Sequence, residues 1–494
     1  MFFRMIYDEG LAQAAYLIGC QKTGEAIIID PERDIDRYIE IAQANRLSIV
    51  AAAETHIHAD FFSGVREFAE RGARAYLSAE GGPDWSYGWP DKKRTDGGAY
   101  DCVLLKNKAH FMIGGVRIDI AHTPGHTPEH LCYFVIDLGG GSDEPMGVCT
   151  GDFVFAGDLG RPDLLESAAG IEGVARPSAG ALFRSTKRFA HWHEHWQVWP
   201  GHGAGSACGK SLGAVPSTTV GYELRHNPAL AFGDDEPRFV DFILADQPEP
   251  PLYFARMKRD NKAGPAVLGK LPAPARVEAA DLGDGGAVVV LDTRPWEAFR
   301  AGFLRGSLWA PVNNSFCAVA GSYIEEGAPI ALVVEPDRLD EAVRMLVRIG
   351  LDTVVSWTTA ASVEAHRSSG GGVETIEEIP ITGVTPGAGV TVIDVRRGAE
   401  HAQGSIAGAR NIAYTQLPRH LGSIPGGKPL HLHCQGGTRS AHAAAYLKRQ
   451  GHEVVNLGGG FGAWERAGRP VEAHVADRAE RADRADRAKR VGQS

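Results

Sequence analysis

Residues 55–60 read T-H-I-H-A-D and follow the apolar run 49–53 after one residue, Glu54. Three further polar motifs also follow apolar runs: T-P-G-H, which ends at His126, C-T-G-D, which ends at Asp152, and P-G-H, which ends at His202. Residues at the ends of successive strands of an open α/β sheet gather at one edge of that sheet. Imidazole and carboxylate groups are suitable ligands for iron, zinc and manganese. The sequence therefore predicts a metal site at the edge of an α/β fold.

The composition restricts the classes of function. The chain has 494 residues, with 44% hydrophobic and 23% charged residues, as in ordinary globular proteins. Its formal net charge of -10 argues against binding to a nucleic-acid backbone, which requires a basic surface. No apolar run reaches the roughly 20 residues of a membrane span, and Asp8 and Glu9 stand where a signal-peptide core would lie. We expect a cytoplasmic protein that acts on small molecules, without nucleic acid or membrane partners.

The order of patterns along the chain indicates several domains. Strand and helix patterns alternate through the first half, which is typical of an α/β protein. Proline and glycine gather between residues 247 and 275 and predict a domain boundary near residue 265. In the second half, Asp292 and Arg294 recur at a constant offset as Asp394 and Arg396, which predicts two similar units. The expected regions are 1–265, 276–368, 373–472 and a charged low-complexity tail, 476–494.

The four histidine and aspartate motifs, in this order, resemble those of the metallo-β-lactamase superfamily over most of residues 1–250. The resemblance implies an αββα sandwich with the metal between its two sheets. The usual first motif of the superfamily is H-x-H-x-D-H, but Phe61 occupies its last position here. A phenyl ring cannot bind a metal, so one ligand of the second metal site is missing. This departure counts against a two-metal hydrolase, in which paired ions hold a bridging hydroxide.

Two histidines and one carboxylate form the ligand set of mononuclear non-haem iron oxygenases. The branch of the superfamily with this chemistry is the persulfide dioxygenases. The resemblance implies one Fe(II) per chain, with zinc as the alternative metal, and three ligands: His56, His126 and Asp152. It also implies that nearby groups orient these ligands or relay protons, namely His58, Asp60 and His202.

Four residues near these motifs are candidates for contact with the substrate. Arg161, in G-R-P-D-L, resembles a segment of the same branch and could hold an anionic substrate, with a structural salt bridge as the alternative. Cys208 follows His202 closely and is either a redox or substrate thiol or a small packed residue. Tyr222 and Arg225 lie in V-G-Y-E-L-R and are weaker candidates for substrate binding.

Residues 434–440 read C-Q-G-G-T-R-S, between an apolar strand pattern and a helix pattern. The two glycines allow successive N–H groups to point inward and form a nest for an anion. The helix that follows presents its N-terminal dipole to the same point, and Arg439 adds a positive charge. All three features favour a thiolate, so Cys434 and Arg439 are predicted to be catalytic. The predicted sulfur-holding loop also contains Gln435, Gly436, Gly437, Thr438 and Ser440.

This loop, with the earlier I-D-V-R and G-S-I-A-G-A, resembles the rhodanese family over about residues 373–472. The resemblance implies a parallel sheet with helices on both faces and a short loop that carries a cysteine persulfide. The preceding repeat has L-D-T-R and G-F-L-R-G-S, but its loop reads V-V-E-P-D-R, with Glu335 expected at the cysteine position. We therefore expect residues 276–368 to be a catalytically inactive rhodanese-like unit.

The expected fold class is α/β: a metallo-β-lactamase sandwich followed by two rhodanese-like domains with parallel sheets. The resemblances imply a sulfide-oxidation enzyme that converts a low-molecular-weight persulfide, dioxygen and water into thiol and sulfite. The rhodanese loop would transfer sulfur between persulfide, sulfite and thiosulfate. Two alternatives stay open, a dinuclear zinc thioester hydrolase of the glyoxalase II type and a non-catalytic sulfur-carrier or sensor protein. We expect a homo-oligomer, either a dimer or a tetramer.

Overall fold

The computed structural model describes residues 1–494 except 169, 171, 283–285, 388 and 473–494, so the predicted charged tail lies outside the described residues. The chain forms two compact units, which are described separately below. Unit 1 contains Met1–Ala273, Val312–Gly321 and Leu339–Thr353. Unit 2 contains Pro274–Pro311, Ser322–Arg338 and Val354–Ser494. The domain boundaries expected from the sequence stay predictions.

Unit 1 is built on two six-stranded mixed sheets. The first has the order β1-β2-β3-β4-β5-β6 and is antiparallel up to β3 and parallel from there on. Its strands are β1 (Phe2–Asp8), β2 (Gln13–Cys20), β3 (Glu25–Ile29), β4 (Ser48–Ala53), β5 (Arg74–Ser78) and β6 (Cys102–Leu105). The second has the order β12-β11-β10-β9-β8-β7, with β10 and β11 parallel. Its strands are β7 (His110–Ile113), β8 (Val116–His122), β9 (Leu131–Asp137), β10 (Gly147–Gly151), β11 (Gln197–Pro200) and β12 (Thr218–Thr219).

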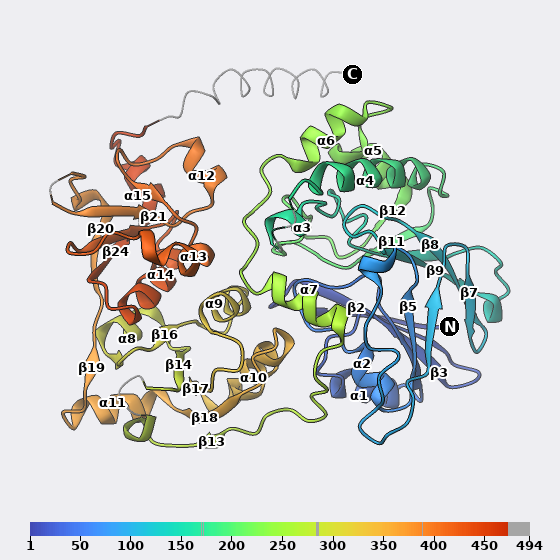
Figure 1. The fold of residues 1–494 in the computed structure, drawn as a ribbon, viewed down its shortest axis with the longest axis horizontal. Coiled ribbons are helices and arrows are strands. Elements are labelled where there is room, and N and C mark those ends of the chain that lie inside the picture. Colours follow the sequence, from blue (N-terminus) through green and yellow to red (C-terminus); the bar gives the residue numbers. More distant parts are fainter. Residues whose placement is uncertain (169, 171, 283–285, 388, 473–494) are drawn as a thin grey trace. The chain divides into compact units, whose positions relative to one another are not determined.

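The two sheets of unit 1 pack face to face, and helices cover their outer faces (Figure 1). Strand β8 shows why: Val116, Ile118 and Ile120 alternate with polar residues and point into the core between the sheets. The first sheet is covered by α1 (Asp36–Ala44) and α2 (Val65–Glu70). The second is covered by α4 (Ala175–Phe189) and α6 (Glu236–Leu244). The αββα sandwich expected from the sequence is therefore confirmed.

Shorter helices complete unit 1. They are α3 (Leu164–Ser167), α5 (Val220–His226), α7 (Phe254–Ala263), most of α9 (Phe316–Tyr323) and α10 (Leu339–Arg348). Helix α7 presents one buried face, with Phe254, Met257, Lys258 and Asn261 at helical spacing. No helix among the described residues is long and apolar enough to cross a membrane.

Unit 2 contains two parallel five-stranded sheets with the same strand order. The first is β13-β18-β17-β14-β16 and the second is β20-β24-β23-β21-β22. Strands of the first sheet are β13 (Ala275–Arg276), β14 (Val289–Asp292), β16 (Leu308–Trp309), β17 (Ile330–Val333) and β18 (Val354–Thr358). Strands of the second are β20 (Glu377–Pro380), β21 (Thr391–Asp394), β22 (Arg410–Asn411), β23 (Leu430–His433) and β24 (Val454–Gly458). The shared order confirms the expected parallel α/β class of both repeats.

Among its described residues, unit 2 also contains a small antiparallel ribbon, six α-helices and several short 3-10 helices. The ribbon pairs β15 (Phe303–Leu304) with β19 (Val373–Glu374). The α-helices are α8 (Trp296–Ala301), α11 (Ala360–Ser368), α12 (Gly398–Gln403), α13 (Leu417–His420), α14 (Thr438–Arg449) and α15 (Gly460–Arg466). In both repeats the arginine after the first central strand binds back to that strand's aspartate. These pairs are Arg294 with Asp292 and Arg396 with Asp394.

Candidate metal centre and sulfur-transfer loop

The polar motifs of unit 1 meet where strands of its two sheets end. His56 follows β4, His126 lies between β8 and β9, and Asp152 and His202 follow β10 and β11. All four side chains are almost fully buried. The structure therefore brings together residues that are far apart in the sequence, as the strand-end pattern predicts.

His56, His126 and Asp152 form the first group of donor atoms, with one ligand atom of each within 4.8 Å of the others. Asp152 Oδ2 lies 3.4 Å from His126 Nε2 and 4.0 Å from His56 Nε2. The opposite ring nitrogens are held: His56 Nδ1 lies 2.9 Å from Thr55 Oγ1, and His126 Nδ1 lies 2.9 Å from the carbonyl oxygen of Arg161. These bonds fix both rings with Nε2 towards the carboxylate.

The charge states of this group suit a metal ion. Burial lowers the pKa of His56 and of His126 well below their usual value, so both imidazoles are neutral and keep a lone pair. Burial raises the pKa of Asp152 to about 6. Neither carboxylate oxygen of Asp152 has a hydrogen-bond partner among the described residues. Buried polar atoms normally have partners, so neutral imidazoles around an unpartnered carboxylate fit a metal site.

Asp60, His202 and Cys208 form a second group of donor atoms beside the first. His202 Nε2 lies 3.3 Å from Asp60 Oδ2 and 3.4 Å from Asp152 Oδ1. Burial, with the nearby charges of Asp152 and Asp60, raises the pKa of the Cys208 thiol well above its usual value. The structure thus places Cys208 against the metal-site aspartates.

His58 is hydrogen-bonded to a residue outside both groups, although its ring centroid lies 4.3 Å from that of His56. Its Nε2 lies 3.1 Å from Asp30 Oδ1, and its ring lies 4.3 Å from the fully buried ring of Phe61. Burial alone would lower the pKa of His58, but Asp30 outweighs burial and raises it to about 9. Asp30 also accepts hydrogen bonds from the amide and the hydroxyl of Thr55. The sequence analysis did not identify Asp30 as a site residue. Like the residues of the other motifs, Asp30 follows an apolar strand pattern.

Arg161 is buried, and its guanidinium has protein partners on every side. It donates to both carboxylate oxygens of Asp163, at 2.8 and 2.6 Å. It also donates to the carbonyl oxygens of Ala207 and Pro248. This geometry is that of the structural salt bridge, and contact between Arg161 and a substrate stays a prediction.

Tyr222 and Arg225 lie on the surface of α5. Tyr222 is 58% exposed and lines a surface cavity of about 590 Å³ with Ala156, Gly157 and Val215. Arg225 forms an ion pair with Glu194. Their predicted roles in substrate binding are not tested by these contacts.

Cys434 stands at the head of a tight loop between β23 and α14. The amide of Gly437 points at the cysteine, with 3.0 Å between its nitrogen and Cys434 Sγ, and Ser440 Oγ lies 3.7 Å from the same sulfur. Gly437 has a φ of 111°, which a side chain would strain, and α14 begins at the next residue. The loop therefore directs an amide and a helix N-terminus at the sulfur, as the glycine pattern predicts.

Two supports of this loop were not foreseen. The amides of Phe461 and Gly462 donate to the carbonyl oxygens of Cys434 and Gln435, at 2.7 and 3.0 Å. A Cβ on Gly460 would lie 2.5 Å from the carbonyl oxygen of Cys434, so only glycine allows this approach. Arg439 donates to both carboxylate oxygens of Glu400, on α12. The three glycines before Phe461 were a sequence signal for such a close approach.

The strand registers identify the residue that corresponds to Cys434 in the first repeat. In the second repeat, Asp394 pairs with His433 across β21 and β23, and Cys434 is the next residue. In the first repeat, Asp292 pairs with Val333 across β14 and β17. The two aspartates are equivalent, since each binds the arginine two residues later. The cysteine position is therefore the residue after Val333.

That residue is Val334, so the expectation that Glu335 stands at the cysteine position is wrong by one residue. Val334 is buried, like Cys434, whereas Glu335 is exposed. The loop continues into a 3-10 turn, Pro336–Arg338. It contains no glycine, and its proline has no N–H to donate. The first repeat therefore lacks both the nucleophile and the loop that would hold a sulfur anion.

Comparison with known proteins also distinguishes an N-terminal metallo-β-lactamase region from a C-terminal rhodanese-like region. The metallo-beta-lactamase superfamily model matches residues 8–188, and the rhodanese-like domain model matches residues 385–467. A metallo-beta-lactamase from Staphylococcus aureus subsp. aureus COL is 37% identical, with a TM-score of 0.64, over 73% of this chain and 99% of that chain. The chain therefore belongs to the metallo-β-lactamase superfamily and carries a rhodanese-like domain in its C-terminal part.

Two curated relatives match separate parts of the chain. A sulfurtransferase from Allochromatium vinosum is 40% identical over 85 residues, which are 17% of this chain and 79% of the relative. The cytoplasmic hydroxyacylglutathione hydrolase of Saccharomyces cerevisiae is 26% identical over 162 residues, which are 32% of this chain and 54% of the relative. These similarities support an enzyme that acts on small molecules.

Proposed function

We propose that the chain is an iron-dependent persulfide dioxygenase joined to a sulfurtransferase. The first reaction converts a persulfide RSSH, dioxygen and water into the thiol RSH, sulfite and two protons. The second transfers sulfane sulfur between a persulfide, sulfite and thiosulfate. The observation that carries the proposal is the first donor group, two neutral histidines and one unpartnered carboxylate, together with Phe61 in the place of a second-site ligand.

His56, His126 and Asp152 would hold the iron, which supplies the redox chemistry between dioxygen and the persulfide sulfur. The chain keeps these three side chains buried, so bulk water is excluded from the reacting groups. Thr55 and the Arg161 carbonyl fix the orientation of the two imidazoles. His202, between Asp60 and Asp152, can hold a proton at Nε2 against either carboxylate.

The loop at Cys434 carries the transfer step. The Cys434 thiolate attacks the outer sulfur of thiosulfate, a new S–S bond forms, and sulfite leaves with the electron pair of the broken bond. The Gly437 amide and the α14 N-terminus stabilise negative charge on the sulfur. A thiol or sulfite then removes the sulfur from Cys434 by the same type of displacement.

A second candidate function is hydrolysis of a thioester by two metal ions. It is favoured by the second donor group, because Asp60, His202 and Cys208 offer three atoms within 4.8 Å of one another. A metal there would lie beside Asp152, whose second oxygen faces His202. This candidate predicts two metal ions per chain.

Metal analysis with an oxygen-electrode trace separates the two candidates. Chain purified without oxygen and loaded with iron should hold about one iron and consume dioxygen when a persulfide is added. His126→Ala should lose both the iron and the oxygen uptake. Two tightly bound zinc ions with thioester hydrolysis, and no oxygen uptake, would contradict the dioxygenase proposal.

A further inference from the structure

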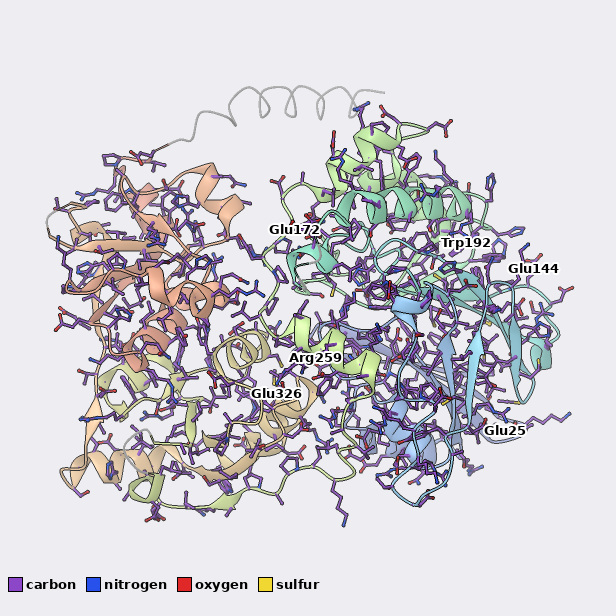
Figure 2. All side chains as sticks on the ribbon, viewed as in Figure 1. Glu25, Glu144, Glu172, Trp192, Arg259 and Glu326 are labelled. Atoms are coloured by element: carbon purple, nitrogen blue, oxygen red, sulfur yellow. The ribbon has the colours of Figure 1, made fainter. Side chains whose placement is uncertain are left out.

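Helix α7 carries a buried lysine that no sequence motif identified. Lys258 is 8% exposed, and its Nζ has no hydrogen-bond partner among the residues that the structure describes. The next residue, Arg259, labelled in Figure 2, is 62% exposed and pairs with Asp260. Lysine is almost never fully buried without a partner, because an ammonium loses its hydration there. A bound anion beside Lys258 would therefore stabilise its buried ammonium.

Helix α7 is fixed against the metal-site loop, so the lysine has a defined position. Asn261, on the same buried face as Lys258, donates to the carbonyl oxygens of His58 and Phe61 at 2.9 and 2.7 Å. Its side-chain oxygen accepts the amide of Ser63 at 3.0 Å. Three hydrogen bonds thus join α7 to the residues that directly follow His56.

The ammonium of Lys258 interacts electrostatically with the groups of the candidate metal site. Its charge acts on His56 and His126, and the charges of Glu129, Cys208 and Asp152 act on it. On another side, the ring centroid of Trp85 lies 4.9 Å from Nζ. The ammonium is therefore within electrostatic reach of the candidate metal-site groups, and the partly buried ring of Trp85 lies beside it.

Glu129 is the one carboxylate outside the donor groups that acts on this ammonium among the described residues. One of its oxygens accepts the amide of Ile57 at 2.8 Å, and the other has no hydrogen-bond partner among the described residues. Lys258 and Glu129 are thus close enough to interact but are not hydrogen-bonded to each other. Burial lowers the pKa of Lys258, and a bound anion would oppose that shift.

We propose that Lys258 binds the anionic sulfur group that occupies the metal site, either the persulfide anion of the substrate or the sulfite formed from it. The inference rests on the proposed function. Arg161, the other cation expected to do this, already donates four hydrogen bonds to Asp163 and to two carbonyl groups. A lysine is a compact charge with three donors that can follow an anion of changing shape, which suits a sulfur atom that gains three oxygens.

The test uses the full chain loaded with metal and three variants: Lys258→Met, Lys258→Arg and the control Lys262→Met. Lys262 is on the same helix, and its ammonium donates to the Asp84 carbonyl oxygen. Binding of sulfite alone is measured by calorimetry, and KM and kcat are measured from oxygen uptake. Lys258→Met should weaken sulfite binding and raise KM by about tenfold, with unchanged metal content. Lys258→Arg should recover most of the affinity, and Lys262→Met should bind like the native chain.

A double variant tests whether Lys258 serves only as a counter-ion of Glu129. Lys258→Met with Glu129→Gln removes both charges. The double variant should bind sulfite as weakly as Lys258→Met does, because the ammonium that would pair with sulfite is absent from both. Native sulfite affinity in the double variant or in Lys258→Met would overturn the inference. If the native chain binds sulfite through Lys258 but consumes no dioxygen with any persulfide, the proposed function fails and the anion site stands.

Discussion

The two rhodanese-like repeats have the same frame and different loops. Each has five parallel strands in the same order, and each holds its first central strand with an aspartate–arginine pair. The strand after the loop begins equally far from the loop in both, since Val334 precedes Val354 as Cys434 precedes Val454. The loops differ because one has a cysteine and two glycines and the other has Val334 and Pro336. The same frame therefore carries two loops of different composition.

The helix that follows the loop also differs in what it contacts. In the first repeat, α10 belongs to unit 1, where Arg348 binds Asp34, Glu32 and Asp8. The carbonyl oxygen of Arg348 accepts the amide of Phe62, two residues after Asp60, at 2.7 Å. In the second repeat, α14 instead directs its N-terminus at Cys434. Helix α10 of the first repeat therefore contacts the loop that follows His56 through the carbonyl oxygen of Arg348.

The largest expected effect is that of Cys434→Ser on sulfur transfer. Transfer from thiosulfate to a thiol should fall to background, because a hydroxyl does not form a persulfide. Iron content and oxygen uptake from an added persulfide should not change, because the metal donors all lie in unit 1. Steady-state assays of both reactions provide the check. Loss of oxygen uptake in a folded, iron-loaded variant would show that the two sites do not act separately.

The next effect is on the stability of unit 1. Arg348→Met should lower the free energy of unfolding by about 3 kcal/mol, because it removes one of the cations paired with the buried carboxylates of Glu32 and Asp34, while Arg37 and Arg344 remain beside them. Denaturant unfolding measures this change. Arg367→Met is the control, since Arg367 forms an exposed ion pair with Glu364 on α11. This variant should have the same free energy of unfolding as the native chain. Equal free energies of unfolding for the two variants would contradict the claim that Arg348 of α10 stabilises unit 1.

A smaller effect concerns the order of protonation in the two repeats. Burial raises the pKa of both buried aspartates, but Arg396 and His433 outweigh burial at Asp394 and lower its pKa. Asp292 has only Arg294 and its pKa is raised. Carbon-13 NMR of labelled aspartate should therefore show Asp292 taking up its proton at a higher pH than Asp394.

The sign of the stability change follows from these directions. Asp394 has a folded pKa below the unfolded value of about 3.9, so its stabilisation is present above that pH and is lost as the pH falls through the folded value. Asp292 has a folded pKa above the unfolded value, so its contribution falls as the pH rises between the two. The reverse order of protonation would contradict the difference drawn between the repeats.

The smallest expected effect is that of restoring only the cysteine. Val334→Cys in a Cys434→Ser background should give background transfer, because Pro336 offers no amide and the loop has no residue like Gly437. The assay is transfer from thiosulfate to a thiol. Recovery of about a tenth of the native rate would show that the first loop can still hold a sulfur anion.

The clustering of the candidate metal donors was predictable, because each of them follows a strand pattern in its own short motif. His56, His126 and Asp152 are brought together by the strand ends alone. The same pattern did not show the direction of His58, because that depends on Asp30 in another loop. Nor did it show the hydrogen bonds of Arg161, one of which depends on the carbonyl of Pro248 far along the chain.

The rest of the site depends on tertiary contacts that a motif does not carry. Lys258 reads as a surface lysine in F-A-R-M-K-R-D-N, and only the packing of α7 buries it. The finding that Val334 occupies the position equivalent to Cys434 required the pairing of β14 with β17, because the loop sequence alone suggested Glu335. Gly460 acts through a close approach to Cys434 from a separate loop.

The central claim is that the metal site oxidises a persulfide, and the ratio of dioxygen consumed to sulfite formed tests it most directly. The measurement uses Cys434→Ser chain, loaded with iron or with zinc, and a persulfide prepared beforehand. The iron form should consume one dioxygen for each sulfite, and the zinc form should consume none, because zinc has no redox chemistry. Sulfite formation without dioxygen, or thioester hydrolysis by the zinc form with no oxygen uptake by the iron form, would contradict the account.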